Sequence, residues 1–389
     1  MRRTIFTDEH DAFRSMCRDF VAKELVPAYE QFEKDGKVAK EFFAKMGELG
    51  LTGLQVPEEY GGGGQTHTFK FNTILNEETA YAATTLGTLR VHQDLVIPYI
   101  LEYANEEQKQ RWLPGMAAGT IMTAIAMTEP GTGSDLTGIR TKAEKKGDHY
   151  VLNGAKTFIS GGINADRVLV VARTSAFDEN DRRGGLSILV VDTETPGFEK
   201  GRNLEKIGLK TQDTAELSFT DVEVPVTDLL GEEGKAFEYL SHNLAQERMT
   251  IAVNAVASAK AAIRFASEYA HERKVFGSPL KSFQNTKFVL AECSTEVEAA
   301  QIMLDHAIEA LDANELSPAD AARVKLFTTE VQARVVDKCL QVHGGYGYIL
   351  EYPIARLYAD ARVTRIYGGT SEVMKTIIAK DMGLSEKRA

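Results

Sequence analysis

The chain has 389 residues, of which 43% are hydrophobic and 26% are charged. This length allows two or three domains around a large core, and the composition is that of an ordinary soluble globular protein. The formal net charge of -11 argues against binding to nucleic acid and to anionic membrane surfaces. A phosphorylated ligand stays possible, because a few local amides or arginines can hold one.

The chain has three cysteines, Cys17, Cys293 and Cys339, which lie far apart in helical patterns. We expect them to be reduced core residues and not a disulfide framework or a metal site. Arg2 and Arg3 precede no apolar run, and no apolar stretch approaches the roughly 20 residues that cross a bilayer. The sequence therefore predicts a cytoplasmic protein with no membrane insertion.

The first third of the chain is helical in pattern. Thr7 is placed to cap a first helix whose apolar stripe covers residues 13–25. Helical periodicity returns at about Phe69 and continues, with interruptions, to Ala118. Residues 1–120 are therefore predicted to form an N-terminal α-helical domain.

The pattern changes at about Ile121, where short β-rich runs separated by Gly, Asp and Asn begin. These runs are Ile121–Met127, His149–Leu152, Lys156–Ile159, Arg167–Ala172, Leu186–Val191 and Glu216–Val222. Because no long helices separate them, they predict a compact antiparallel β domain, a barrel or a sandwich, over residues 121–231.

Residues 232–389 are helical again. The predicted helices cover Lys235–Arg273, Pro279–Ala313, Ser317–His343, Tyr352–Val363 and Thr370–Met382. Long helices with short connections predict an antiparallel bundle. The predicted fold class is therefore α+β, with a helical domain, a middle β domain and a C-terminal helical bundle.

Glu247 lies on the apolar face of the first long C-terminal helix, one turn after Leu244 and one turn before Ile251. A carboxylate on a buried face is costly unless it is paired, protonated or facing a cavity. Burial would also raise its pKa above about 4.3, which suits a group that abstracts a proton. From the helix alone, a residue at the rim or one paired with a Lys or Arg of another helix is the more common case.

Four segments place polar residues beside glycines: Met127–Asp135, Phe158–Gly162, Gln341–Gly345 and Tyr367–Glu372. The first is no dinucleotide fingerprint, because its third glycine is missing. The last fronts a helix start with two glycines, which would let a ligand approach backbone N–H groups. Each segment alone is a weak signal. No metal, nucleoside triphosphate or serine-hydrolase motif is present.

In their order and spacing these segments resemble the acyl-CoA dehydrogenase family along essentially the whole chain. The matching segments are Ala126–Asp135, Phe158–Ser160, Arg273–Gly277, Gln341–Tyr348 and Tyr367–Thr370. The helix–strand–helix organisation is also the fold of that family. The resemblance implies a homotetramer with one FAD per subunit, an acyl-CoA thioester as substrate and electron transfer flavoprotein as electron acceptor.

The resemblance also implies roles for individual residues. Positions that line the flavin ring and its phosphates are matched by Met127, Thr128, Ser134, Phe158 and Ser160. FAD contacts at a subunit interface are matched by Arg273, Phe276, Gln284, Gln341, Gly344 and Gly345, and those near the diphosphate and adenosine half by Thr370 and Glu372. Ser134 and Gly369 match substrate-contacting positions. Arg248 is expected either to hold the neighbouring substrate face or to form a purely structural ion pair.

The chain departs from the commonest family pattern at the catalytic base. Most members carry a Glu directly after the tyrosine that matches Tyr367, and this chain has Gly368 there. A minority, resembling the long-chain and isovaleryl enzymes, place the carboxylate on the first long C-terminal helix, which Ala245–Arg248 matches. The resemblance therefore makes Glu247 the expected base. It also implies that the Gly368 backbone N–H and a flavin ribityl hydroxyl stabilise the thioester oxygen.

The expected reaction is α,β-dehydrogenation of a saturated acyl-CoA to the trans-2-enoyl-CoA. The resemblance favours a medium- to long-chain acyl group and leaves branched or ring-bearing groups open. The nearest alternative is an acyl-CoA oxidase or another oxygen-using flavoprotein of the same fold. A non-catalytic acyl-CoA-binding scaffold is the second alternative, and it would be expected to lack both base positions.

Overall fold

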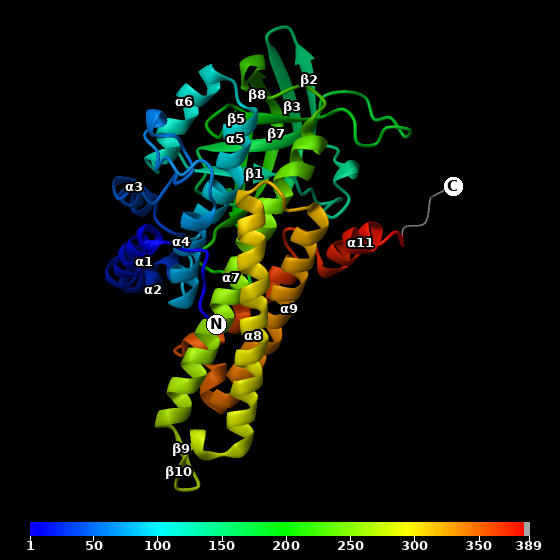
Figure 1. Cartoon of the computed structure of the whole chain (residues 1–389). Helices are drawn as coiled ribbons and strands as arrows, with labels where there is room; N and C mark the ends of the chain where they lie inside the picture. Colours follow the sequence, from blue (N-terminus) through cyan, green and yellow to red (C-terminus); the bar gives the residue numbers. More distant parts are fainter. Residues whose placement is uncertain (385–389) are drawn as a thin grey trace.

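The computed structural model describes residues 1–384 (Figure 1). In chain order it contains a helical region, a β-sheet and a second helical region. The elements follow the predicted order of helices, strands and longer helices, so the α+β fold class is confirmed. The change from helix to strand falls between residues 117 and 123, and the change back between residues 230 and 236. The domain limits at residues 120 and 231 stay a prediction.

The first helical region lies along the side of the molecule, at the blue end of the colour scale (Figure 1). Thr7 precedes its first helix, as predicted, and the Thr7 N–H donates to His10 Nδ1 at 3.2 Å. The α-helices are α1 (Asp8–Phe20), α2 (Val26–Asp35), α3 (Lys40–Glu48), α4 (Lys70–Tyr81), α5 (Ile97–Tyr103) and α6 (Glu106–Ala117). Shorter turns are η1 (Val21–Leu25), η2 (Glu58–Tyr60) and η3 (Val91–Val96), of which η1 and η3 are π-helical.

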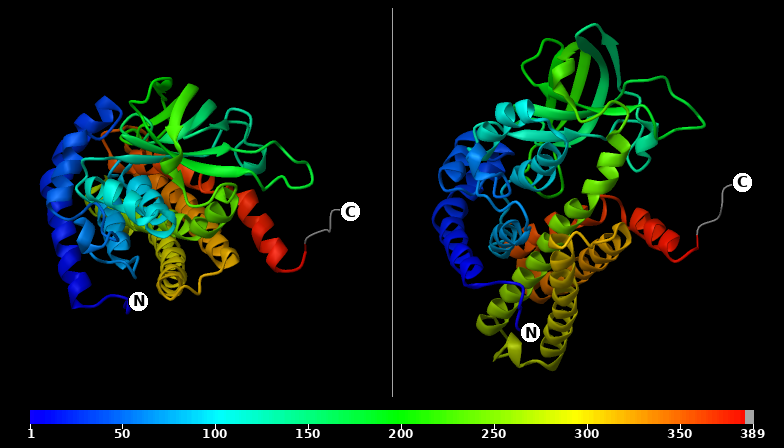
Figure 2. Two further views of the ribbon diagram at one scale, coloured as in Figure 1. Left: turned by 90° about the horizontal axis from the view of Figure 1, so that it is seen from above. Right: turned by 45° about the horizontal axis from the view of Figure 1, so that its top comes forward.

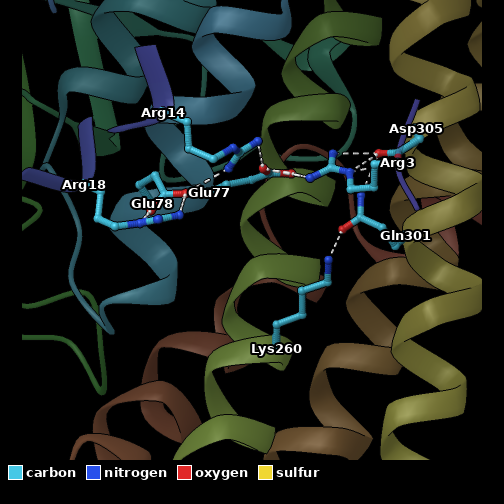
Figure 3. Close-up of polar contacts among 8 residues, drawn as sticks. All are labelled: Arg3, Arg14, Arg18, Glu77, Glu78, Lys260, Gln301 and Asp305. Atoms are coloured by element: carbon cyan, nitrogen blue, oxygen red, sulfur yellow. Dashed lines mark hydrogen bonds and ion pairs between the residues drawn. The ribbon is translucent and has the colours of Figure 1, made fainter. Parts of the chain in front are cut away.

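Charged side chains connect the N-terminal segment to both helical regions (Figure 3). Arg3 pairs with Glu77 of α4 and with Asp305 of a C-terminal helix, both at 2.7 Å. Arg14 of α1 pairs with Glu77 at 2.8 Å and with Glu78 at 2.9 Å. These partly buried pairs hold α4 in place, and α4 in turn packs against the longest helix of the bundle.

The sheet of the middle region has the strand order β6-β7-β3-β2-β4-β5-β8, with β1 paired to β4. Figure 2 shows this sheet at one end of the helical bundle. The strands are β1 (Thr123–Ala126), β2 (Lys142–Lys146), β3 (His149–Ser160), β4 (Arg167–Arg173), β5 (Leu186–Asp192), β6 (Phe198–Asn203), β7 (Thr214–Pro225) and β8 (Leu229–Leu230). Short 3-10 turns, η4 (Leu136–Gly138) and η5 (Val226–Asp228), join some of them.

The sheet differs from the sequence prediction in three ways. It is mixed and not purely antiparallel, because β1 and β2 both pair with β4 in parallel. The two runs predicted at His149–Leu152 and Lys156–Ile159 are one strand, β3, whose pairing with β7 shifts register twice. Strands β2 and β6 were missed, because their charged and exposed residues lack an apolar alternation.

The C-terminal region is a bundle around α7 (Ala236–Glu272), which packs against α4, α8 and α9. The other helices are α8 (Gln284–Asp312), α9 (Pro318–His343), α10 (Pro353–Ala361) and α11 (Ser371–Asp381). The 3-10 turns η6 (Leu280–Ser282), η7 (Gly344–Tyr348) and η8 (Arg362–Arg365) connect them. Ser317 and Thr370 cap α9 and α11 through their side chains, as the sequence predicts.

The predicted start of a helix at Pro279 is wrong. A hairpin of β9 (Lys274–Val275) and β10 (Ser278–Pro279) follows α7, and α8 begins only at Gln284. Two residues with positive φ, Phe276 at 47° and Gly277 at 80°, make the tight turn of the hairpin. A proline is favoured in the first turn of a helix but is equally compatible with a short edge strand.

The core of the bundle consists largely of small and branched residues, so that the helices approach closely. Ala252, Val256 and Ala259 of α7 meet Val331 and Val335 of α9 in one buried cluster. The three cysteines are buried and free, as predicted. Within residues 1–384, no helix is both long and apolar enough to span a bilayer.

Candidate active site

Glu247 lies at the point where α7 enters the protein interior. Upstream of it, from Ser241, the helix is exposed or half-buried, and downstream, from Arg248 to Ala259, every residue is buried. Glu247 itself is half-buried by surface area. Burial of its carboxyl among protein atoms nevertheless raises its pKa above the ordinary value of 4.5. The sequence expectation of a carboxylate with raised basicity on this face is therefore met.

The Glu247 carboxyl lies beside Gly368, in the turn before α11. A Cβ atom placed on Gly368 would lie 3.4 Å from Glu247 Oε1 and 2.3 Å from Ile251 Cδ1. The two base positions considered from the sequence therefore point into the same space from different elements. Gly368 and Gly369 have φ values of +61° and +92°, which favour glycine at both positions.

Residues on either side of Glu247 are anchored to Asp94 of η3. Gln246 Nε2 donates to the Asp94 backbone oxygen at 2.9 Å, and Thr250 Oγ1 donates to Asp94 Oδ2 at 3.0 Å. The remaining bonds to the Asp94 carboxylate come from the side-chain amides of Asn72 and Asn76. This buried polar cluster fixes the rotation of α7, and hence the direction of Glu247. π-helical turns such as η3 are often found at functional sites.

Two buried cations accompany Glu247. Arg248 is 4% exposed, and its Nη1 donates to the Pro318 backbone oxygen at 3.4 Å. Lys325 of α9 has no exposed surface, and its Nζ donates to the Gly369 backbone oxygen at 2.6 Å. Both positive charges offset part of the rise in the pKa of Glu247. The predicted contact of Arg248 with substrate stays a prediction, since its side-chain hydrogen bond leads to the start of α9.

Lys325 was missed from the sequence, because most of its neighbours on the same helical face are polar and give no apolar stripe. Ala321, Lys325, Thr328 and Gln332 follow a spacing of four, three and four residues and are all buried. A lysine in such a stripe is as unusual as a glutamate. Burial lowers the pKa of Lys325 from 10.5 to about 8.

Met127, Thr128, Phe158 and Ser160, which we call the platform, lie where β1 and β3 end in the middle region. The Thr157 N–H donates to the Thr128 backbone oxygen at 2.9 Å, which joins the two strand ends. Phe158 has a φ of +58° and its side chain is 68% exposed, an uncommon conformation that turns a large aromatic ring outward. Gln212 Nε2 donates to Ser160 Oγ at 2.9 Å. Met127 is half-buried and directly precedes Thr128, so Met127, Thr128 and Phe158 lie at neighbouring strand ends, and their contact with flavin stays a prediction.

A buried ion pair holds the loop that follows β1. Lys156 of β3 donates to Glu129 Oε1 at 2.9 Å and to the Met127 backbone oxygen at 3.0 Å. Glu129 also accepts from the backbone N–H groups of Arg140 and Thr141. Burial alone would raise the pKa of Glu129, but Lys156 and these donors outweigh it and lower the pKa below 4.5. Ser134, a predicted contact of both cofactor and substrate, is exposed on this loop.

The remaining predicted FAD contacts lie in two other places. Thr370 and Glu372 stand at the start of α11, where Thr370 Oγ1 accepts from the Val373 N–H at 3.3 Å. The other set surrounds the far end of α7, at the bottom of Figure 1. It comprises the exposed residues Arg273, Phe276, Gln284, Gln341, Gly344 and Gly345. The Arg273 guanidinium lies over the Tyr346 ring at 5.8 Å, which joins the hairpin to η7.

The far set lies at the opposite end of α7 from Glu247. Arg273 follows Glu247 by 26 residues along α7, which at about 1.5 Å per residue is about 39 Å. This distance exceeds the reach of one dinucleotide. Within one chain, the far set and the residues around Glu247 and Gly368 therefore cannot contact the same dinucleotide.

Comparisons with known proteins identify the family to which the chain belongs. Models of the N-terminal, middle and C-terminal domains of acyl-CoA dehydrogenase match residues 7–120, 124–222 and 234–383. The mitochondrial long-chain specific acyl-CoA dehydrogenase of Sus scrofa is 43% identical over 381 residues, covering 98% of this chain and 88% of that protein.

Solved structures agree as well. The crystal structure of acyl-CoA dehydrogenase from Geobacillus kaustophilus has a TM-score of 0.95 and 44% identity, covering 98% of this chain and 100% of that one. A glutaryl-CoA dehydrogenase from Mycobacterium smegmatis, solved in complex with FADH2, has a TM-score of 0.90 and 28% identity, covering 99% of this chain and 97% of that one. The chain therefore belongs to the acyl-CoA dehydrogenase family, whose members are flavoprotein oxidoreductases that act on the CH–CH group of their donors.

Proposed function

We propose that this protein is an FAD-dependent acyl-CoA dehydrogenase that converts a saturated acyl-CoA to the trans-2-enoyl-CoA, with Glu247 as the base. One observation carries the proposal. The Glu247 carboxyl occupies the space beside Gly368, the position where most members of the family carry their base. A chain with Gly368 and no other carboxylate there would have no group to remove the proton.

Glu247 removes the α-proton of the thioester. Its raised pKa makes the carboxylate a stronger base than one in water, which brings it closer to the weakly acidic α C–H. The neutral carboxyl that results is also the form that a buried position favours. The positive charges of Arg248 and Lys325 offset part of this rise in the pKa of Glu247.

The backbone N–H of Gly368 donates to the thioester oxygen, on which negative charge develops as the proton leaves. Such a preorganised donor typically contributes about 3–4 kcal/mol in a site that excludes water. Gly368 lacks a side chain, so substrate can approach its backbone closely. Ser134 and Gly369 are proposed to contact the substrate beside it, and Arg248 to hold the substrate-facing side of α7.

FAD, when bound, would supply the acceptor for the hydride that leaves the β-carbon. Its ring would be held by Met127, Thr128, Phe158 and Ser160, with Ser134 near the phosphates. The outward Phe158 ring and the joined strand ends support this fit. Thr370 and Glu372 would hold the diphosphate and adenosine half at the start of α11, where free N–H groups favour anions.

A second copy of the chain would complete the FAD site. Its far end of α7 carries the set Arg273, Phe276, Gln284, Gln341, Gly344 and Gly345, which in its own chain begins about 39 Å from Glu247. Phe276, in the turn of the β9–β10 hairpin, is 96% exposed, and a second chain that packs there would bury this aromatic ring. Both observations support the homotetramer that the family resemblance implies.

We further propose a medium- to long-chain acyl group and electron transfer flavoprotein as the electron acceptor. The identity to a long-chain specific relative supports the acyl length. Members of the family act on acyl-CoA and can work with electron transfer flavoprotein.

The test is anaerobic mixing of the purified holoprotein with a panel of saturated acyl-CoA thioesters of different length and branching. Bleaching of the flavin absorbance with formation of enoyl-CoA is the expected result. Glu247→Gln should keep bound FAD and lose nearly all bleaching, because the amide cannot accept the proton. Retention of more than a few per cent of the rate would place the base elsewhere.

The same preparation separates the alternatives. Hydrogen peroxide formed in proportion to enoyl-CoA in air would favour an oxidase of the same fold. A colourless protein that binds acyl-CoA but contains no flavin would favour a scaffold.

A further inference from the structure

Lys325 is a buried charge whose contact with the Gly368 turn has no part in the reaction described above. It lies on α9, has no exposed surface and is in hydrogen-bond contact with the turn that carries Gly368. Burying an ammonium group costs free energy unless the group is paired and hydrogen-bonded. Its only side-chain hydrogen bond within residues 1–384, to the Gly369 backbone oxygen at 2.6 Å, joins α9 to the turn before α11.

The turn that Lys325 holds would be mobile without it. Gly368 and Gly369 both have positive φ and no Cβ, so neither residue restricts its own backbone. On the upstream side, the Tyr367 N–H donates to the Val363 backbone oxygen at 3.1 Å. On the downstream side, Lys325 holds the Gly369 carbonyl directly before the cap of α11. The two glycines are thus fixed at both ends, and the direction of the Gly368 N–H depends on both.

Charged groups of three helices surround Lys325. Burial is the main reason that its pKa falls to about 8, and Arg248 of α7 lowers it further. Glu247 of α7, Glu330 of α9 and Glu372 of α11 act in the opposite direction. Lys325 is therefore mostly protonated at neutral pH. In that form its charge lowers the pKa of Glu247.

We propose that Lys325 is a positioning residue for the dehydrogenation: it holds Gly369 so that the Gly368 N–H faces the thioester oxygen. This inference rests on the proposed function. Before proton transfer the negative charge is on Glu247, and afterwards it is on the thioester oxygen beside Gly368. Lys325 is close to both places, so its charge stabilises the site throughout the transfer.

The test compares Lys325→Met, which removes charge and donor, with Lys325→Arg, which keeps both. Lys338→Met is the matched control, because Lys338 is on the same helix but pairs with Glu292 and Glu296 at the surface. We expect Lys325→Met to keep its FAD and to lower kcat by about 10- to 100-fold, the effect of a misdirected donor. Lys325→Arg should recover part of this loss, and Lys338→Met should match the wild type.

A pair of ligands separates positioning from packing. An enoyl-CoA has the thioester oxygen, whereas the S-alkyl-CoA thioether of the same length lacks it. Lys325→Met should weaken binding of the enoyl-CoA by about 10-fold, the loss of about one hydrogen bond to a charged or polarised oxygen. Binding of the thioether should not change. Equal weakening of both ligands, or no change in kcat, would overturn the proposal.

The pH profile tests the role of the charge. In Lys325→Met the acid limb of kcat/KM should move to higher pH, because Glu247 loses a neighbouring positive charge. If Lys325→Met does not fold, Lys325→Gln and Lys325→Arg carry the same test, and identical acid limbs in these two variants would overturn the proposal. A wild-type protein that bleaches with no acyl-CoA would refute the proposed function itself, which is a different result.

Discussion

Replacement of Gly368 by alanine tests the close approach between the turn before α11 and α7. The new Cβ would lie 2.3 Å from Ile251 Cδ1, inside van der Waals contact, and Ile251 is itself buried. The residue would also have to keep a φ of +61°. The backbone conformation costs about 1–2 kcal/mol for a residue other than glycine. Overpacking adds about 1–3 kcal/mol, so the total loss of stability is about 2–5 kcal/mol.

Two further variants separate the two costs. Gly50→Ala has a similar φ of +68° and no atom within 4 Å of the new Cβ, so it should lose only the backbone part of about 1–2 kcal/mol. Ile251→Val removes the atom that the new Cβ meets and costs about 0.5–1.5 kcal/mol alone. In the double variant Ile251→Val/Gly368→Ala the overpacking cost should therefore disappear.

The assay is thermal unfolding of each holoprotein, together with kcat on one acyl-CoA substrate. We expect the double variant to be more stable than the sum of the two single changes by about 1–3 kcal/mol. Gly50→Ala should keep the wild-type kcat, because it lies after α3 and away from the site. If the single changes add within about 0.5 kcal/mol, the contact between Gly368 and Ile251 is not as described.

The other predictions concern proton uptake and assembly. Activity should rise with pH through the raised pKa of Glu247, since the protonated carboxyl cannot accept the α-proton; a kcat/KM profile with no acid limb would contradict this. The free energy of unfolding should respond in the opposite sense, because the folded state binds the Glu247 proton more tightly than the unfolded state does. The stabilisation that Glu247 contributes therefore falls as pH rises from 4.5 through its pKa in the folded state. Glu247→Gln should lack this pH dependence when unfolding is measured across the same pH range. Phe276→Ser should lower both the assembled mass in analytical ultracentrifugation and the flavin content; an unchanged assembly with full flavin would refute a second copy at the FAD site.

Much of the fold could be predicted from apolar periodicity. The long helix containing Glu247, the capped helices after Ser317 and Thr370 and the change to strands near Ile121 all have the expected places. The mixed sheet could not be predicted in this way. Strand β2 pairs in parallel with β4 through only one residue pair, Lys142 with Arg173, and its charged sequence gives no apolar pattern.

The candidate site shows a similar division. Glu247 could be found because a carboxylate interrupts an apolar stripe. Its closeness to Gly368 is a tertiary contact that no local pattern contains, and only the resemblance, which makes Glu247 the base in place of a Glu at position 368, connects the two positions. Lys325 could not be found in this way, because its helical face also contains Thr328 and Gln332 and its partner, the Gly369 carbonyl, is reached only in the folded chain.

The Lys156–Glu129 pair has a consequence for how the platform receives a ligand. Lys156 joins the loop after β1 to the strand whose end carries Phe158, and it does so entirely through contacts within the protein. The conformational entropy of these segments is thus lost when the chain folds and not when a planar ring arrives. Binding then costs mainly the translational and rotational entropy of the incoming molecule, so preordering of the loop favours tight binding.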